Sequence, residues 1–426
     1  MSKSSIKNWK GTSVVMGVDW GDSGKGRLID DLSARADIIA RYNGGANTGH
    51  SINNQYGKFA LHIIPSGIFN SKALNLVGRG VLVDCDSLEV ELSELKAAKV
   101  STKNLIIDPQ ASLVMPWHKM RDGLREKLRS AKKVGTTGKG VGPAYADRTE
   151  RVGLLVADLI STNFKKLLYE ETKVQNNFYH LKIDANEVYK KYLSYAKMVK
   201  PFVNNTVEIL AKAAEAQKNI LFEGAQGYFL DIDSGTYPFV TSSNPGALGI
   251  WRSFDLHPAR INHVIGITKA YTTRVGNGPM PTKMDEKTSK FIVTKGLEIG
   301  TTTGRIRSPG WLDLVLLKAA NDSNKLTSLA ITKLDVLSGL EKLRLCTGYK
   351  LGGKPVNYVS HNSEFLAKVT PVYTEFAGWD ENITTARTFT ALPKNAQKYI
   401  KAIEDFTKIP VHFISVGPKR GEVIYV

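Results

Sequence analysis

Residues 21–26 place an acid and a cation together in one glycine-rich turn. The segment reads Gly-Asp-Ser-Gly-Lys-Gly, comes after an apolar run at 14–17 and precedes a helix-like run at 27–32. Glycines let the backbone of such a turn approach phosphate oxygens closely, and the N-terminus of the next helix adds a partial positive charge. Lys25 adds a full positive charge, and Asp22 could bind a metal ion or accept a proton. The segment therefore predicts a phosphate-binding loop, with an ordinary strand-to-helix turn as the alternative.

This loop differs from a standard P-loop at two positions. The P-loop motif requires a glycine five positions before Gly24 and a serine or threonine directly after the lysine. The chain has Asp19 and Gly26 at these positions. A phosphate loop of a different kind is therefore expected, and it needs support from the rest of the chain.

Six further segments rich in glycine, hydroxyl, amide or charged residues provide that support. They are RYNGGANTGH at 41–50, GTTGKGVGPAY at 135–145, FEGAQG at 222–227, VTSSN at 240–244, TTTGRIR at 301–307 and TKLD at 332–335. Together with residues 21–26, and in this order, they resemble the adenylosuccinate synthetase family. The resemblance extends from about residue 13 to the C-terminus.

The resemblance implies a GTP-dependent ligase of purine nucleotide biosynthesis, which joins L-aspartate to C6 of IMP and forms GDP. The C6 oxygen of a 6-oxopurine is a poor leaving group. Phosphorylating it first turns it into phosphate, which the amine of aspartate can displace. This scheme needs a base for N1, charge stabilisation for the triphosphate, Mg²⁺ as cofactor, and groups that hold three anionic ligands.

The resemblance also implies four catalytic residues and a magnesium site. Asp22 takes the N1 proton, and Lys25 neutralises charge on the transferred phosphoryl group. His50 stabilises or protonates the leaving β-phosphate, and Gln226 holds the phosphorylated 6-oxygen as an uncharged donor. Asp22 and the backbone carbonyl of Gly49 bind Mg²⁺.

By the same resemblance, five residues bind the nucleoside monophosphate. Asn47 and Gln226 contact the 6-oxygen, and the hydroxyls of Thr137 and Thr241 bind the 5′-phosphate. Arg151 matches an arginine that family members insert into the site of a neighbouring subunit, which implies a homodimer. Without the resemblance, Arg151 is one of many surface arginines.

Residues 303–307 look like the loop that grips aspartate, with Thr303, Arg305 and Arg307 as its ligands. Arginines at positions i and i+2 of an extended loop face the same side, so both guanidinium groups can meet carboxylates of a single ligand. The family often continues with more arginines, whereas this chain has Ser-Pro-Gly at 308–310.

Residues 332–335 follow an apolar run, which places Thr-Lys-Leu-Asp at the end of a strand. A carboxylate there can accept both N1–H and the exocyclic amine of guanine. Adenine offers no such pair of donors, so GTP is expected over ATP. The complete GTP-binding set implied by the resemblance is Ser23, Gly24, Lys25, Gly26, Lys333, Asp335, Ser415 and Gly417.

Three residues of the nucleotide loops depart from the family pattern. Family members usually have Gln at 19 and Glu at 23, where this chain has Asp19 and Ser23, and Ala46 stands where a histidine is common. Replacing the acid beside Asp22 removes a negative charge and opens space near the purine. A viral branch that acts on dGMP has small hydroxyl residues in this loop, so dGMP is the alternative acceptor. That branch typically lacks the aspartate that Asp22 matches, and IMP is therefore favoured.

Two further alternatives are not enzymes. The formal net charge of +18 could indicate a nucleic-acid-binding protein. However, the lysines are scattered without interleaved aromatic residues, and an enzyme with three anionic substrates also needs positive charge. A nucleotide sensor is the other alternative, and the retention of Asp22, Lys25, His50 and both loop arginines opposes it.

The pattern of apolar runs predicts an α/β fold with a large, mostly parallel central sheet flanked by helices. Strands are expected at 14–18, 37–42, 73–77, 104–107, 219–222, 264–270, 328–333 and 411–415. We expect one domain over 13–426, with an inserted helical subdomain at about 117–218 and a polar N-terminal extension at 1–12. No apolar run approaches membrane-spanning length, so a cytoplasmic protein without a membrane partner is expected.

Overall fold

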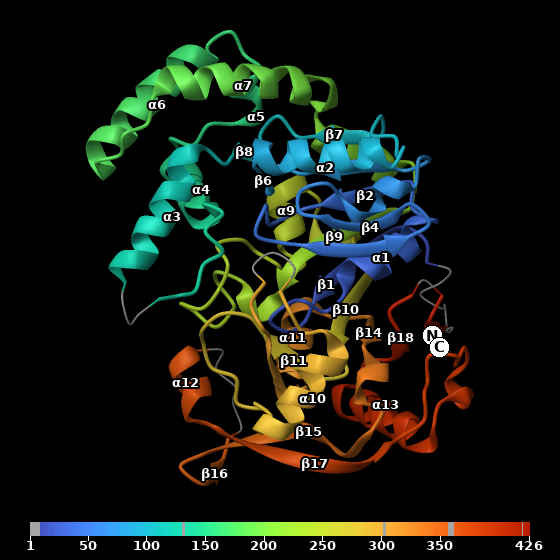
Figure 1. Cartoon of the computed structure of the whole chain (residues 1–426). Coiled ribbons are helices and arrows are strands. Elements are labelled where there is room, and N and C mark those ends of the chain that lie inside the picture. Colours follow the sequence, from blue (N-terminus) through green and yellow to red (C-terminus); the bar gives the residue numbers. More distant parts are fainter. Residues whose placement is uncertain (1–8, 130–132, 301–303, 357–361, 420) are drawn as a thin grey trace.

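A nine-stranded sheet forms the centre of the molecule (Figure 1). The computed structural model describes residues 9–129, 133–300, 304–356, 362–419 and 421–426. The strand order is β19-β18-β14-β10-β1-β9-β2-β5-β7. In chain order these strands are β1 (Thr12–Gly17), β2 (Ile38–Arg41), β5 (Leu74–Val77), β7 (Leu105–Ile107), β9 (Ile220–Gly227), β10 (His263–Lys269), β14 (Ser328–Thr332), β18 (Val411–Ser415) and β19 (Val423–Tyr425).

Neighbouring strands of this sheet are parallel, except that β19 pairs with β18 in the antiparallel direction. Both faces of the sheet are buried. Along β1, Val14 and Met16 belong to the core on one face, whereas Val15 belongs to the core on the other. Parallel strands covered on both faces have continuous apolar sequences, which is why these strands could be recognised from the sequence.

Helices pack on both faces of the sheet. Leu28, Ile29 and Leu32 of α1 pack on the face of Val15, whereas Leu210 of α8 and residues of α9, α11 and α13 pack on the opposite face. The helices are α1 (Lys25–Ser33), α2 (Cys85–Ala97), α3 (Pro116–Leu128), α4 (Val141–Glu150), α5 (Val156–Leu159), α6 (Phe164–Tyr179), α7 (Ala185–Val199), α8 (Thr206–Glu215), α9 (Gly249–Phe254), α10 (Glu286–Gly296), α11 (Leu314–Asn324), α12 (Ser363–Lys368) and α13 (Lys394–Thr407).

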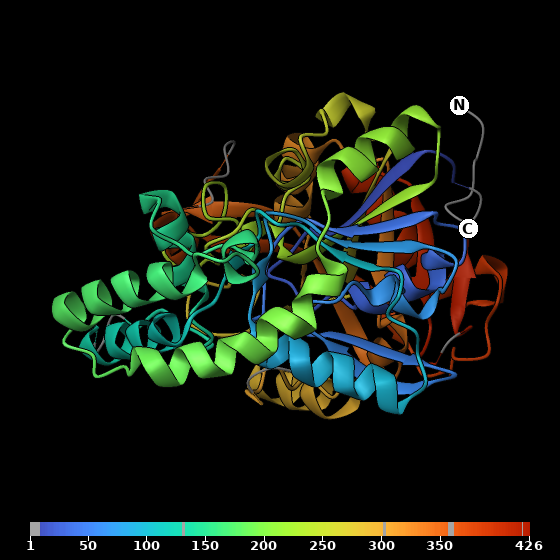
Figure 2. The same ribbon diagram turned by 90° about the horizontal axis from the view of Figure 1, so that it is seen from above.

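Six helices, α3 to α8, follow one another in the segment where the sequence predicts a helical subdomain. Figures 1 and 2 both show α6 and α7 extending away from the central sheet. Smaller pairings complete the fold. They involve β3 (His50–Asn54), β4 (Gly57–Leu61), β6 (Leu82–Val83), β8 (Ser112–Leu113), β11 (Thr272–Arg274), β12 (Ser308–Gly310), β13 (Leu312–Asp313), β15 (Leu340–Leu351), β16 (Lys354–Pro355) and β17 (Thr370–Trp379).

The predicted fold class is confirmed: the molecule is an α/β protein with a large, mostly parallel sheet flanked by helices. Each of the eight predicted strands corresponds to a strand of the central sheet, and β19 is the ninth, which the sequence did not predict. The expected N-terminal extension joins the fold earlier than residue 13, because Trp9 is buried against the core and β1 begins at Thr12. Among the described residues, no helix is long and apolar enough to cross a membrane.

Candidate active site

A cavity of about 1620 Å³ lies at the carboxyl ends of the parallel strands. Its walls include the loop after β1, the loop after β2, the end of β9, and the segments that follow β14 and β18. Ligands of open α/β sheets bind outside the carboxyl ends of the strands, where the connecting loops meet. The sheet therefore brings together motifs that are far apart in the sequence.

The loop after β1 has the backbone geometry of an anion-binding turn. Gly21, Asp22 and Gly24 have φ angles of 91°, 56° and 83°. Gly24 is the N-cap of α1, and Lys25 is the first residue of that helix. Lys25 is buried and its Nζ donates to the backbone oxygen of Gln226, 2.5 Å away. Burial lowers the pKa of Lys25, and nearby carboxylates oppose that shift.

The two unusual residues of this loop bond to each other. The hydroxyl of Ser23 donates to Oδ1 of Asp19 over 2.9 Å, and both side chains are buried. The backbone N–H of Gly21 donates to the same oxygen over 2.8 Å. Asp19 thus brings an acidic side chain into the loop from its inner side. Burial raises the pKa of Asp19, and Lys25 together with the bonds from Gly21 and Ser23 opposes that shift. The hydroxyl of Ser23, which lines the cavity, is turned towards Asp19.

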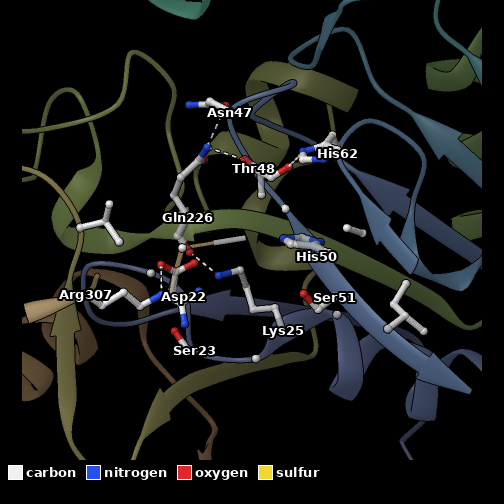
Figure 3. Close-up of a pocket in the computed structure, with 18 of the residues that line it drawn as sticks. Asp22, Ser23, Lys25, Asn47, Thr48, His50, Ser51, His62, Gln226 and Arg307 are labelled. Carbon is white, nitrogen blue, oxygen red and sulfur yellow. Dashed lines mark hydrogen bonds and ion pairs between the residues drawn. The ribbon is translucent and has the colours of Figure 1, made fainter. Parts of the chain in front are cut away.

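Asp22 forms an ion pair with the second arginine of the predicted aspartate loop. Nε of Arg307 lies 2.8 Å from Oδ2 of Asp22, and Nη1 of Arg307 lies 2.8 Å from Oε2 of Glu298. Figure 3 shows Asp22 and Arg307 facing each other below Gln226. Burial by itself would lower the pKa of Arg307, but the two carboxylates outweigh it and raise that pKa.

Gln226 connects the loops after β1 and β2. Its Nε2 donates to Oδ1 of Asn47 over 3.1 Å and to Oγ1 of Thr48. Asn47 in turn donates to Oγ1 of Thr241 over 3.3 Å. Three residues that the resemblance assigns to the monophosphate, Asn47, Gln226 and Thr241, therefore form one hydrogen-bonded chain along the cavity. Figure 3 shows its part between Gln226 and Asn47.

His50 is held by a buried glutamate that the sequence did not single out. Nδ1 of His50 is hydrogen-bonded to Oε1 of Glu223, which also accepts from Oγ of Ser66 over 2.6 Å. The backbone N–H of Ser66 donates to the other oxygen over 2.7 Å. Burial by itself would raise the pKa of Glu223, but His50 and the other polar neighbours lower it. Nε2 of His50 has no hydrogen-bond partner among the described residues, and it is the ring atom left for a ligand.

The end of the cavity where the sequence predicts guanine binding is built from the segments after β14 and β18. Asp335 lies in a short 3₁₀ helix, lines the cavity, and has its pKa raised by burial. Ser415 and Gly417 both accept hydrogen bonds from Nη1 of Arg27, with 2.6 Å to the Ser415 hydroxyl. Arg27, on α1, thereby ties the phosphate loop to the C-terminal segment. Its role could not be predicted because its partners lie almost 400 residues away.

The remaining predicted residues are less closely grouped. Thr137 lines the cavity, but Arg305 does not; Nη1 of Arg305 donates to the backbone oxygen of Gly135 over 3.1 Å. The two loop arginines thus have separate partners in this structure. Arg151 is exposed at the C-cap of α4 and also lies outside the cavity wall. Thr303 is outside the described residues.

The donor set fits the magnesium ion that the resemblance implies. Asp22 and Gly49 both line the cavity and offer a carboxylate and a backbone carbonyl, the hard oxygen donors that Mg²⁺ prefers. In the described part of the chain, no group of three or more His, Cys, Asp or Glu residues could hold a metal by itself. Mg²⁺ usually takes one or two protein ligands and completes its shell with phosphates and water, so this sparse set suits it.

A parallel sheet whose strand ends carry a buried lysine, a phosphate-type turn and a guanine-type carboxylate defines a nucleotide-dependent enzyme. The family model described as adenylosuccinate synthetase matches residues 14–424. The adenylosuccinate synthetase of Clostridium botulinum is 45% identical over 421 residues, which cover 97% of this chain and 98% of that protein. The chain belongs to the adenylosuccinate synthetase family and is a GDP-forming carbon–nitrogen ligase of purine nucleotide biosynthesis.

Two solved structures are similar to this one. The fully ligated adenylosuccinate synthetase of Plasmodium falciparum is 35% identical and has a TM-score of 0.94, with 98% of this chain and 100% of that chain covered. The succinoaminodeoxyadenylate synthetase of cyanophage S-2L, bound to dGMP and dATP, is 18% identical with a TM-score of 0.62, over 98% of this chain and 95% of that one. The phage enzyme shares the fold.

Proposed function

We propose that this enzyme uses GTP to join L-aspartate to C6 of IMP through a 6-phosphoryl intermediate, giving adenylosuccinate. The observation that carries the proposal is the meeting of Asp22, Lys25, His50 and Gln226 on one wall of a cavity that also reaches Asp335. A base, a cation, an uncharged amide donor and a guanine-type carboxylate are the groups that this reaction needs. We place the enzyme in the cytoplasm, where these metabolites are used.

In the first step, Asp22 accepts the N1 proton of IMP, and the resulting 6-oxyanion attacks the γ-phosphate of GTP. Lys25 lies at the start of α1, so its charge and the N-terminus of the helix both oppose the negative charge that builds up on the phosphoryl group. Nε2 of His50 is directed to the leaving β-phosphate. When bound, Mg²⁺ supplies further charge neutralisation at the phosphates through Asp22 and Gly49.

In the second step, the amine of aspartate displaces phosphate from C6. Gln226 and Asn47 are neutral amides that would orient the 6-oxygen without removing the proton that Asp22 must take. For this, Gln226 must give up one of its present bonds to Asn47 and Thr48. Arg305 and Arg307 bind the carboxylates of aspartate. For this, Arg307 must share its guanidinium between aspartate and its present partners, Asp22 and Glu298.

The structure of the loop after β1 supports IMP over dGMP as the acceptor. The hydroxyl of Ser23 donates its hydrogen bond to Asp19, so the two unusual side chains are partners of each other within the loop. The acid that the family carries at 23 is moved to 19 and is not lost. A pocket modified to admit a 2-amino group would be expected to leave a donor or acceptor facing the ligand.

The acceptor is tested by phosphate release with GTP, L-aspartate and Mg²⁺, with IMP and dGMP compared in parallel. We expect kcat/KM for IMP to exceed that for dGMP, and the ratio to change by less than about tenfold in the double variant Asp19→Gln/Ser23→Glu. A gained or lost contact with the purine would change this ratio by about 10–200-fold. The single variant Ser23→Glu is the control, since it places two carboxylates together in a buried loop and should lower the melting temperature. A wild type that turns over dGMP but not IMP contradicts the proposal.

We also propose that the enzyme is a homodimer in which Arg151 reaches the 5′-phosphate of the neighbouring site. Its exposure at the end of α4, away from its own cavity, supports this arrangement. Arg151→Ala should raise KM for IMP at least tenfold, the usual scale for a charge-assisted phosphate contact of about 1.5–3 kcal/mol.

Subunit mixing provides the sharper measurement for Arg151. At an IMP concentration well below the raised KM of the Arg151→Ala protein, mixing it with the Asp22→Asn protein should restore activity, because one of the two sites in a hybrid dimer has both residues intact. Mixtures that stay inactive although hybrids form would show that Arg151 acts within its own subunit. The control is Arg148→Ala, which removes the same charge one turn earlier on α4 and is mixed with the Asp22→Asn protein in the same way.

A further inference from the structure

Glu298 is a fully buried carboxylate that accepts from four donors. Oε2 lies 2.8 Å from Nζ of Lys269 and 2.8 Å from Nη1 of Arg307. Oε1 lies 2.9 Å from Nζ of Lys333 and also accepts from the hydroxyl of Tyr271. Burial by itself would raise the pKa of Glu298, but Lys269 and Lys333 outweigh it and lower that pKa. Each carboxylate oxygen therefore has two donors, and the side chain is held from several directions.

Two of these donors belong to different substrate sites. Arg307 belongs to the predicted aspartate loop, whereas Lys333 begins the segment that carries the guanine-binding Asp335, two residues later. Both line the cavity, but Glu298 does not. Glu298 therefore does not line the ligand cavity itself, but it holds two cations that do.

The backbone fixes Glu298 at the base of the aspartate loop. It follows α10, and the backbone N–H of Arg307 donates to its carbonyl over 2.9 Å. Next to this pair, Ile299 and Ile306 form an isolated bridge, and the N–H of Gly300 donates to the oxygen of Arg305 over 2.7 Å. Main-chain and side-chain bonds between Glu298 and Arg307 thus hold the two ends of the aspartate loop together at the core.

We propose that Glu298 is a positioning residue that couples aspartate binding to GTP binding by holding Arg307 and Lys333 on one carboxylate. The inference rests on the proposed function, since it takes the roles of the two sites from there. A ligand that fixes either cation also fixes one donor of the shared carboxylate, so the second ligand meets a cation with fewer alternative arrangements. The coupling is reciprocal: aspartate tightens GTP binding by the same factor by which GTP tightens aspartate binding.

The test compares variants that alter the same buried cluster in different ways. Removing one partner from a buried ion pair leaves an uncompensated charge and is strongly destabilising. The double variant Glu298→Gln/Lys269→Met avoids this because it removes one anion and one cation together. The single variant Lys269→Met is the matched control, since Lys269 is fully buried, lies outside the cavity wall, and leaves Arg307 and Lys333 on Glu298.

The affinity of a non-hydrolysable GTP analogue is measured calorimetrically on protein saturated with IMP and Mg²⁺, with and without L-aspartate. We expect aspartate to tighten the analogue by about 5–150-fold in wild type and in Lys269→Met, the usual range of coupling between sites. In the double variant this factor should fall to about one to two, while the affinity for IMP stays unchanged. A structural defect alone would weaken all three ligands.

Two outcomes overturn the proposal: no coupling in wild type, or full coupling in the double variant. If the double variant does not fold, Glu298→Asp replaces it, because the shorter side chain cannot hold both cations at their present distances and should lose part of the coupling. Full coupling in that variant also contradicts the proposal. The ligase assay on wild type distinguishes a failure of the coupling proposal from a failure of the proposed function. A wild type without ligase activity would reject the proposed function itself.

Discussion

Replacing Asp22 with asparagine should lower kcat by about 10²–10⁴-fold, the usual contribution of a positioned general base. Asparagine has nearly the same volume but cannot accept the N1 proton. The affinity for IMP should change little, because Gln226 and Asn47 remain in place. Phosphate release under saturating substrates gives kcat, and calorimetric titration with IMP gives the affinity.

Asp19→Asn is the matched control for this prediction. It changes the same loop by the same chemical step, but the Asp19 side chain is buried behind the loop and does not line the cavity. Its main effect should be on stability, through the bonds from Gly21 and Ser23. If Asp22→Asn lowers kcat by less than about tenfold, Asp22 is not the base.

The sheet and the nucleotide loops could be predicted because their signals are local. Strands buried on both faces have continuous apolar runs, and the loops after β1 and β2 have glycines where the backbone must turn sharply. The short edge strand β19 was missed because its signal is only three residues, Val423–Tyr425, close to the end of the chain. An antiparallel partner of this length has little pattern of its own.

The supporting charges of the site could not be predicted because their partners are distant in sequence. Glu223 stands inside a segment that was recognised, yet its bond to His50 spans 173 residues. Glu298 forms ion pairs with Lys269, Arg307 and Lys333, which come from three different parts of the chain. Ligand-binding residues can be found in a single sequence because they lie in motifs. The residues that hold them in place can be found only once the fold is known.

The exchange at positions 19 and 23 shows how such a pairing changes an interpretation. Taken separately, Ser23 indicates a lost acid, and Asp19 indicates a lost P-loop glycine. Their hydrogen bond shows one internal arrangement that keeps a carboxylate in the loop. The departure from the family pattern therefore also concerns the support of the loop, which neither residue indicates when taken alone.

Replacing Asp335 with asparagine should convert the preference of the enzyme from GTP to xanthosine triphosphate. The carboxylate accepts N1–H and the 2-amino group of guanine, whereas the amide of asparagine can donate to the 2-oxo group of xanthine. Asp335 is partly buried, so an unmatched donor in this pocket is costly. Sites built to hydrogen-bond a ligand group can reject its analogue by about 10⁴–10⁵-fold, and a change of at least about 10²-fold in the ratio of kcat/KM values is expected.

Competition among GTP, xanthosine triphosphate and ATP measures this change, with IMP and aspartate held at saturation. Asp335→Ala is the control: it should lose GTP use without gaining xanthosine triphosphate, because it removes the acceptors but adds no donor. A wild type that prefers ATP would show that Asp335 does not read the base. If Asp335→Asn instead retains its preference for GTP, backbone groups near Ser415 and Gly417 must select guanine. These are the other predicted GTP-binding residues at that end of the cavity.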